Sequence, residues 1–279
     1  MADAVTVSTQ DAAASRAAHI VDVLIAERAP TLSASPLWPL VRPPLYRLLA
    51  YRKARTMADA ISVMGGREAL DFVSDLLALE VEVTGLERLP AGGRCIVVAN
   101  HPTGIADGIA VYDAQKAARP HNVFYANSDA HRVCPRFDET LIPVEWVPAK
   151  RSRDRTRLTL SMTKEAMEAE RTLMVFPAGK LARRGPDGVL VDPEWMPTAL
   201  SVAARYAAPV VPLHVAGPWA AMFHFFDRFS PELRDVTLFH ELLNKRGRRF
   251  RIVIGEPVTP DRLASDAAVA SAALKAYVE

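Results

Sequence analysis

The sequence predicts an α/β fold in which a mixed, largely parallel sheet is flanked by helices and preceded by an N-terminal helical extension. Beyond residue 80, apolar runs of strand length alternate with longer segments of helical spacing, which favours a parallel sheet. Before residue 80, helical spacing and prolines prevail. Half of the 279 residues are hydrophobic, enough to bury one large core. We therefore divide the chain into a helical extension, 1–79, and a main domain, 80–279.

Apolar periodicity assigns the individual elements. Helices are expected at 16–28, from Leu45 onward and at 59–79 with an interruption at Gly65-Gly66, and a proline-rich stretch, 30–44, separates the first two. In the main domain, strands are expected at 81–84, 95–99, 123–126, 141–147, 173–176, 210–215 and 250–254, and helices at 105–117, 155–171, 198–206 and 261–278. Pro212 suggests an irregular or edge position for its strand. The less regular segment 217–247 is expected to form an insertion over one end of the sheet.

Composition excludes several classes of protein. A formal net charge of +2 does not argue for a nucleic-acid partner. The two cysteines, Cys95 and Cys134, have no metal-ligand spacing and indicate a reducing compartment. No apolar run reaches the roughly 18 residues that a membrane-spanning helix needs. Motifs for serine hydrolases, nucleotide phosphates and zinc proteases are absent from the sequence.

The first chemical motif is a strand that ends in Asn-His. The apolar strand 95–99 is followed by Asn100, His101 and a Pro-Thr-Gly turn, and then by a helix that opens with Asp107. This order places His101 at the carboxyl end of a strand, where open α/β sheets bind their ligands. The Asp107 carboxylate, favoured in a first helical turn, lies within reach of the imidazole and would fix its tautomer. Alone, the motif also fits a helix cap beside a structural histidine.

A second strand ends in a similar turn. Phe176, Pro177, Ala178 and Gly179 form that turn, and the cationic residues Lys180, Arg183 and Arg184 follow it. Backbone N–H groups and cations gathered in this way are typical of an anion site. The alternative is an ordinary turn with solvated charges.

Taken in order, the motifs resemble those of the glycerolipid (lysophosphatidic-acid-type) acyltransferase superfamily. Asn-His at a strand end is followed by Phe-Pro-x-Gly about 75 residues later and then by Pro-Val-Val-Pro at 209–212. The form Asn-His-Pro-x-Gly-x-x-Asp-Gly, and the stretch 241–247 before the last strand, resemble the bacterial branch that includes hemolysin-named proteins and aminolipid O-acyltransferases. The resemblance covers roughly residues 80–260.

The resemblance implies roles for individual residues. His101 would be the general base and Asp107 its partner, with acyl-CoA or acyl carrier protein as the donor and no covalent acyl-enzyme. Phe176, Pro177 and Gly179 would help to place the acceptor. The further residues expected to bind substrate are Asn100, Thr103, Gly104, Lys180, Arg183, Arg184 and Arg151. No metal or redox cofactor is needed, and backbone donors near Gly179 are candidates for the oxyanion site.

Two positions depart from the family pattern. Five residues separate His101 from Asp107, where the widespread signature has four. Either the turn absorbs one more residue, as the resemblance to the bacterial branch implies, or the two side chains pair more loosely. Ala178 stands where the family has a glutamate, which opens the acceptor to lysolipids other than glycerol phosphates. The expected acceptor is therefore a lysophospholipid or a lyso-aminolipid.

Three further surfaces are candidates for binding partners. The basic cluster 150–155 is suited to a phosphate or to an acidic acyl carrier protein, unless it is only a solvated charge run. Two apolar stripes, 37–51 with its interleaved arginines and 219–229, have the composition of membrane-docking elements, although core-facing stripes are commoner. We therefore expect a peripheral protein at the cytoplasmic face of the inner membrane.

Two other functions stay open at this stage. An acyl-thioester hydrolase would use the same fold to pass the acyl group to water. A non-catalytic module that binds lipid or acyl carrier protein would not need His101 or Asp107.

Overall fold

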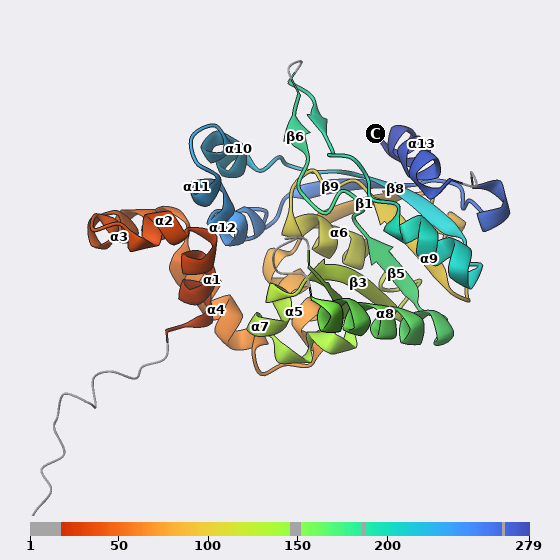
Figure 1. Cartoon of the computed structure of the whole chain (residues 1–279), viewed down its shortest axis with the longest axis horizontal. Helices are drawn as coiled ribbons and strands as arrows, with labels where there is room; N and C mark the ends of the chain where they lie inside the picture. The colour runs from red at the N-terminus through yellow and green to blue at the C-terminus, as the bar shows by residue number, and fades with distance from the viewer. Residues whose placement is uncertain (1–17, 146–151, 186–187, 264–265) are drawn as a thin grey trace, which may run out of the picture.

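The computed structural model describes residues 18–145, 152–185, 188–263 and 266–279. The strands are β1 (Glu80–Thr84), β2 (Cys95–Ala99), β3 (Asn122–Asn127), β4 (Leu141–Val144), β5 (Thr172–Val175), β6 (Arg183–Arg184), β7 (Leu190–Val191), β8 (Val210–Ala216) and β9 (Arg249–Ile254). Seven of them form one sheet in the order β1-β9-β8-β2-β5-β3-β4, whereas β6 and β7 form a separate hairpin (Figure 1).

The helices are α1 (Ile20–Arg28), α2 (Pro30–Ala34), α3 (Trp38–Leu48), α4 (Tyr51–Ile61), α5 (Gly66–Leu77), α6 (Ile105–Gln115), α7 (Asp129–Val133), α8 (Arg153–Glu168), α9 (Thr198–Tyr206), α10 (Ala221–Asp227), α11 (Pro231–Asp235), α12 (Leu238–Leu243) and α13 (Ala267–Val278). Neighbouring strands from β8 to β4 are parallel, β9 is antiparallel to β8, and β1 runs parallel to β9. The mixed, largely parallel sheet with N-terminal helices is therefore confirmed.

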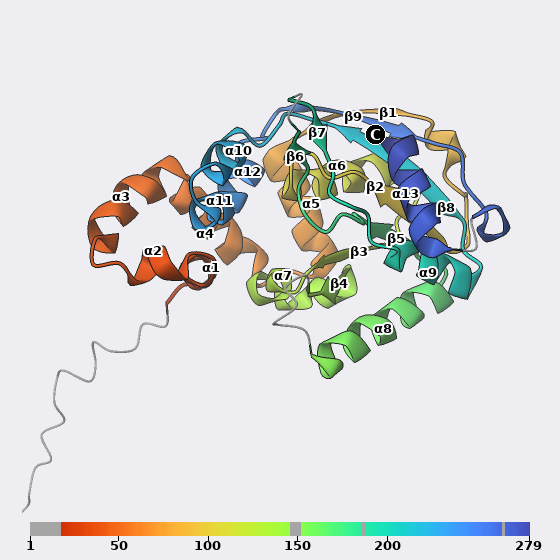
Figure 2. The same cartoon turned by 45° about the horizontal axis from the view of Figure 1, so that its top comes forward.

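Strand β2 is the centre of a three-layer arrangement. Its residues alternate between the two faces of the sheet, because successive side chains of a strand point in opposite directions. Val97 and Ala99 pack in the core with α5 and α6, whereas Ile96 and Val98 pack in the core with α8, α9 and α13. All four are at most 1% exposed, as expected for a parallel strand covered on both faces (Figure 2).

Of the two positions that Pro212 suggested for its strand, the irregular one is confirmed and the edge one is wrong. Strand β8 lies inside the sheet, between β9 and β2. Pro212 is accommodated because the pairing is interrupted there: Val210 pairs with Val258 before the proline, and the β8–β9 ladder starts after it, where Leu213 pairs with Ile254. The carbonyl of Pro212 still accepts a hydrogen bond from Gly255 N–H (2.8 Å), so only one ladder bond is missing.

The proline-rich stretch 30–44 is more helical than the sequence suggested. It contains α2 and most of α3. Pro39 lies in the first turn of α3, where the missing N–H has no helical partner to lose. The helix then continues through Pro43 and Pro44, so tertiary packing overrides the local preference.

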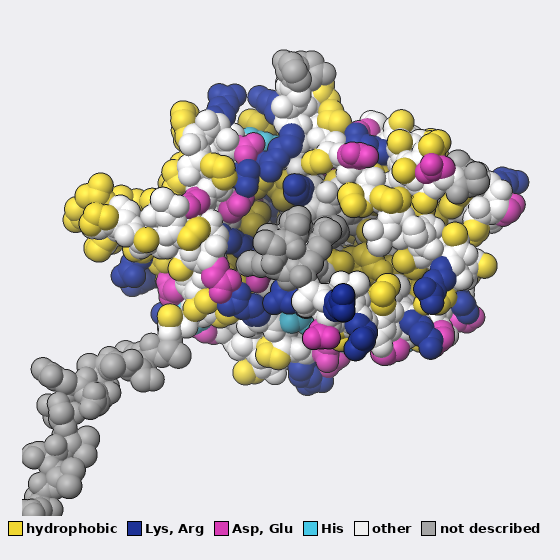
Figure 3. All heavy atoms as spheres, in the orientation of Figure 1, with side chains coloured by type: hydrophobic (Ala, Val, Ile, Leu, Met, Phe, Trp, Pro, Cys, Tyr) yellow, Lys and Arg dark blue, Asp and Glu magenta, His cyan; other side chains and the backbone are white. Residues whose placement is uncertain are grey.

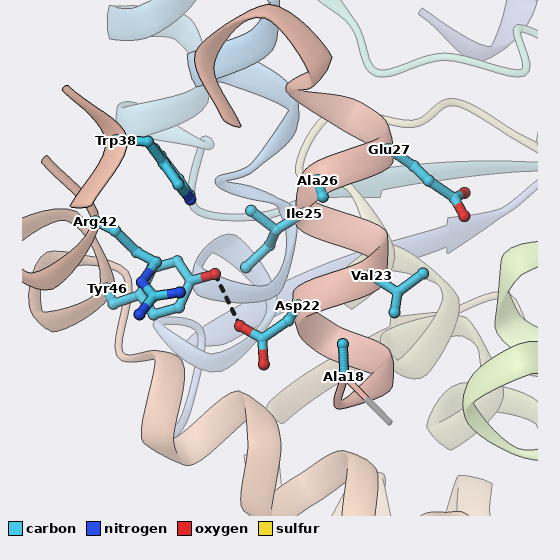
Figure 4. Close-up of a pocket in the computed structure, with 9 residues that line it drawn as sticks. All are labelled: Ala18, Asp22, Val23, Ile25, Ala26, Glu27, Trp38, Arg42 and Tyr46. Carbon is cyan, nitrogen blue, oxygen red and sulfur yellow. Dashed lines mark hydrogen bonds between the residues drawn. The ribbon is translucent and has the colours of Figure 1, made fainter. Parts of the chain in front are cut away.

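Helices α3 and α4 are held against α1 by tyrosine hydroxyls, one from each helix. Tyr46 and Tyr51 donate to the two carboxylate oxygens of Asp22 (2.9 and 2.6 Å), and burial together with Asp22 raises the pKa of Tyr51 to about 12. Trp38 packs edge-on against Tyr46. Asp22, Trp38 and Tyr46 line a pocket of about 470 Å³ between α1 and α3, which none of the predicted site residues lines (Figure 4).

The segment 217–247 forms three short helices, where irregular structure was expected. Helices α10–α12 lie beside α1–α4 at one end of the molecule (Figures 1 and 2). A buried ion pair between Glu241 and Lys245 (2.8 Å, each side chain at most 3% exposed) holds them together. Glu241 also accepts the N–H groups of Met222 and Phe223, and Lys245 donates to the carbonyl of Trp219. The stretch 241–247 noted in the sequence therefore fixes the start of α10.

No helix among the residues that the structure describes combines the length and apolarity needed to cross a membrane.

Candidate active site

His101 follows β2 at the carboxyl edge of the parallel strands. Its Nδ1 lies 3.0 Å from Asp107 Oδ2, and its side chain is 16% exposed while that of Asp107 is fully buried. Asp107 therefore holds the imidazole so that Nδ1 carries the proton when the ring is neutral. No described residue hydrogen-bonds Nε2, so this atom is free to act as a base.

The buried Asp107 carboxylate is held by several hydrogen bonds. It accepts hydrogen bonds from the N–H of Thr103 (2.8 Å), the hydroxyl of Thr103 (2.5 Å) and the N–H of Gly104 (3.0 Å), in addition to the contact with His101. Its place in the first turn of α6 adds the favourable helix dipole. Thr103 is fully buried, so Thr103 and Gly104, which were expected to bind substrate, orient Asp107 instead.

Gly104 explains how the turn absorbs its additional residue. Its backbone has φ +98° and ψ −144°, a region that residues with a side chain rarely adopt. An added Cβ would also lie 3.2 Å from the Leu181 side chain. Glycine at this position lets the chain close back on Asp107 across five intervening residues.

Asn100 lies at the site but its side chain is engaged by the neighbouring strand. Its amide donates to the carbonyl of Val215 (2.9 Å) and accepts the N–H of Val215 (2.6 Å). Asn100 is only 7% exposed. The sequence pointed to substrate binding, whereas these contacts lock the end of β2 to β8 and so fix where His101 emerges.

The Phe-Pro-x-Gly turn lies directly beside the histidine. The ring of Phe176 stacks on the ring of His101, with centroids 4.4 Å apart, and the carbonyl of His101 accepts the N–H of Ala182 (2.9 Å). Pro177 is buried beneath the turn. The N–H of Gly179 donates to the carbonyl of Phe176 (3.0 Å), so this donor is already used within the turn and is not available to an oxyanion.

The predicted cations do not form one open cradle. Arg183 is half-buried, pairs with Asp227 (3.2 Å) and stacks on Phe223, and burial lowers the pKa of its guanidinium. Arg184 is exposed and lies over the ring of Trp219, 4.4 Å from its centroid. Lys180 is exposed. Lys180 and Arg184 are thus the cations that solvent and ligands can reach.

Arg151 lies outside the described residues, so its predicted role in binding substrate has no structural counterpart. Lys150 also lies outside the described residues. Residues 153–155 of the basic cluster begin helix α8, where the hydroxyl of Ser152 caps the N–H of Arg155 (3.2 Å). Among the residues described, no group of three or more histidine, cysteine, aspartate or glutamate side chains is arranged to hold a metal ion.

The structure adds one residue that the sequence did not single out. Asp192, which follows β7, is 4% exposed and accepts the backbone N–H of His101 with both carboxylate oxygens (3.1 and 3.2 Å). The indole N–H of Trp195 donates to the same carboxylate (2.9 Å). The only available signal was an Asp-Pro-x-Trp run in a loop, which identifies no partner 91 residues away.

Comparison with known proteins finds similarity to acyltransferases. A family model described as Acyltransferase matches residues 80–216. A lyso-glycine lipid O-acyltransferase from Phocaeicola vulgatus is 28% identical over 203 residues, 69% of each chain. A protein of the same description from Bacteroides thetaiotaomicron is 26% identical over 199 residues, 69% of this chain and 71% of that one.

A solved structure, the 1-acyl-sn-glycerophosphate (LPA) acyltransferase of Thermotoga maritima, is 18% identical, with 91% of this chain and 94% of that chain covered and a TM-score of 0.48. The family model and the two relatives, together with the ordered motifs, define an acyltransferase. These findings support the glycerolipid acyltransferase superfamily, as the sequence motifs indicated.

We predict that Gly104→Ala weakens both the fold and the activity. The strained backbone costs about 1–3 kcal/mol of the free energy of unfolding, and it moves Asp107 away from His101. The matched control is Gly108→Ala on the same helix, where an added Cβ meets nothing within 4 Å and stability rises by up to about 1 kcal/mol. Urea denaturation and acyl transfer measure the two effects; equal stability of both variants would contradict the role assigned to Gly104.

Proposed function

We propose that this chain is an O-acyltransferase that moves a fatty acyl group from an acyl thioester to the hydroxyl of a lysolipid. The observation that carries the proposal is the geometry of His101: Nδ1 is bound to buried Asp107, while Nε2 is free at the carboxyl edge of the sheet. A histidine held in this way is prepared to take a proton from a hydroxyl group.

The proposed reaction is a direct transfer. Nε2 of His101 takes the proton of the acceptor hydroxyl while that oxygen attacks the thioester carbonyl carbon. The tetrahedral intermediate then releases the thiolate, and the imidazolium returns the proton to it, giving the acylated lipid and a free thiol. Asp107 stabilises the transient positive charge of the ring, and Phe176, stacked on the ring, limits its movement. Every step uses groups of the protein and its two substrates alone.

The proposed acceptor carries an anionic head group, and a lyso-aminolipid with a free carboxylate is the first candidate. Both relatives are described as lyso-glycine lipid O-acyltransferases. Ala178, buried in the turn, leaves no carboxylate there to repel such a head group. Exposed Lys180 and Arg184 are the cations nearest to the turn in sequence, and a carboxylate suits a guanidinium well. A lysophospholipid is the second candidate.

The donor is proposed from the family, as acyl-CoA or acyl carrier protein. At the same edge of the sheet as His101, a pocket of about 980 Å³ lies beyond the ends of β3 and β4, where Leu158 and Met162 contribute apolar side chains. Arg155 also lines it but is paired with Glu145 (2.7 Å). Most of its other lining residues are polar or charged, so the pocket alone does not select one of the two donors.

The decisive test supplies purified protein with a long-chain acyl thioester and a panel of lysolipids that carry carboxylate, phosphate or neutral head groups. We expect acylated lipid with the carboxylate lipids first, and His101→Ala to lower the rate by a factor of about 10² or more. The product is measured by mass spectrometry.

Two other results would contradict the proposal. Thioester cleavage at the same rate with and without acceptor would identify a hydrolase. Equal lipid binding by wild type and His101→Ala, with no turnover on any acceptor, would identify a binding module.

We also propose that the protein docks on a membrane through α3 and α10. On α3, Leu40 is 74% and Leu48 is 53% exposed, and the exposed residues Arg42 and Arg47 lie beside them. Figure 3 shows hydrophobic side chains gathered over α3 at one end of the molecule. Phe225 and Phe229, also exposed, lie in the neighbouring insertion. Apolar side chains flanked by arginines suit the interface of an anionic bilayer.

Leu40→Glu is expected to weaken binding to anionic lipid vesicles by about tenfold or more, because an exposed leucine that enters lipid contributes about 1.5–3 kcal/mol. The control is Leu158→Glu, an exposed leucine of α8, which should leave vesicle binding within twofold. Flotation with liposomes measures both. If the two variants bind as wild type does, α3 is not the docking surface.

A further inference from the structure

Asp192 is a second buried carboxylate against His101. It reaches the backbone of His101, whereas Asp107 reaches the ring. Burial raises the pKa of Asp192, while the N–H groups of Trp195 and His101 act in the opposite direction and favour the ionised form. Burying an ionised carboxylate costs desolvation free energy, which hydrogen-bond donors offset only in part. A buried carboxylate directly beside the histidine therefore suggests a role in the site.

The segment that carries Asp192 touches both motifs of the active site. At one end, Asp192 binds His101; at the other, the N–H of Met196 donates to the carbonyl of Pro177 (3.0 Å). Trp195, 3% exposed, lies between these contacts and donates to Asp192. Residues 192–196 therefore connect the histidine turn to the Phe-Pro-x-Gly turn.

We propose that Asp192 is a positioning residue for the transfer: it fixes the main chain of His101 and, as a second buried carboxylate, stabilises the imidazolium formed when His101 takes the acceptor's proton. The inference rests on the proposed function. The two carboxylates then have different tasks. Asp107 sets the tautomer of the His101 ring, whereas Asp192 fixes the His101 main chain and adds a second negative charge near the ring.

Other charged groups also lie close to Asp192 and His101. The Asp192 N–H donates to the Glu279 carboxylate (2.5 Å), and the ammonium group of Lys275 pairs with that carboxylate. These two charges offset each other at the end of α13. Asp107, on α6, is the remaining carboxylate in contact with His101. Asp192 is therefore the nearby charge whose removal leaves the ring contact of His101 in place.

The test is Asp192→Asn, a substitution of equal size that removes the charge. Loss of negative charge makes the imidazole harder to protonate, so the acidic limb of the kcat/KM profile should move to lower pH by about half a unit or more. We expect kcat to fall about tenfold, with the KM for the acceptor within threefold. The matched control is Glu194→Gln, an exposed carboxylate of the same segment, which should change neither quantity.

A second measurement is independent of turnover and so separates this inference from the proposed function. The pH at which the His101 ring signal changes, followed by NMR, should also move down in Asp192→Asn. Circular dichroism confirms that the variant is folded; if it is not, Asp192→Ser is judged by the same criteria. An unchanged NMR midpoint in a folded variant would overturn the role of Asp192, whereas wild-type protein without turnover would overturn only the proposed reaction.

Discussion

The buried carboxylate of Asp107 is the constraint on which the active site depends. A charge without solvent must be compensated by hydrogen bonds or by an opposite charge. The turn before α6 meets this need with two N–H groups and a hydroxyl, and His101 supplies the remaining contact. These hydrogen bonds shape the backbone of the turn. Gly104 therefore adopts a conformation that is suited to glycine. The direction of the imidazole follows from the same carboxylate.

The parallel sheet brings distant segments to the histidine that this carboxylate holds. β2 and β5 are neighbours and parallel, so the residues that follow them, His101 and Phe176, meet at one edge and stack. The hairpin β6–β7 returns the chain to the same edge, where Asp192 receives the His101 N–H. The segment 217–247 contacts the hairpin where Arg184 stacks on Trp219. Lys245, paired with Glu241, donates to the carbonyl of Trp219 and so holds it in place. The exposed Arg184 and the proposed base His101 are thus linked by one connected set of contacts.

Local spacing predicted the parts of the site that are local. His101 and Asp107 are six residues apart, and the strand, turn and helix between them could be derived from the sequence. The tasks of Asn100 and Thr103 could not, because their hydrogen bonds to Val215 and Asp107 depend on three-dimensional packing. Asp192 was missed because its partner lies 91 residues away and carries no pairing pattern. Helix α3 was not predicted because of its prolines, and the interior position of β8 was not predicted because of Pro212. In both cases tertiary contacts outweigh the local preference of proline.

The proposed chemistry requires that Asp107 hold His101 with Nδ1 protonated and Nε2 without a proton. Nitrogen-15 NMR of histidine-labelled protein at a pH where the ring is neutral tests it most directly, with the His101 signal identified by its loss in His101→Ala. The account predicts that the proton is on Nδ1 in wild type and that this preference weakens in Asp107→Ala. A proton on Nε2 in the wild-type protein would contradict it, because the ring would then have no free nitrogen facing an acceptor hydroxyl.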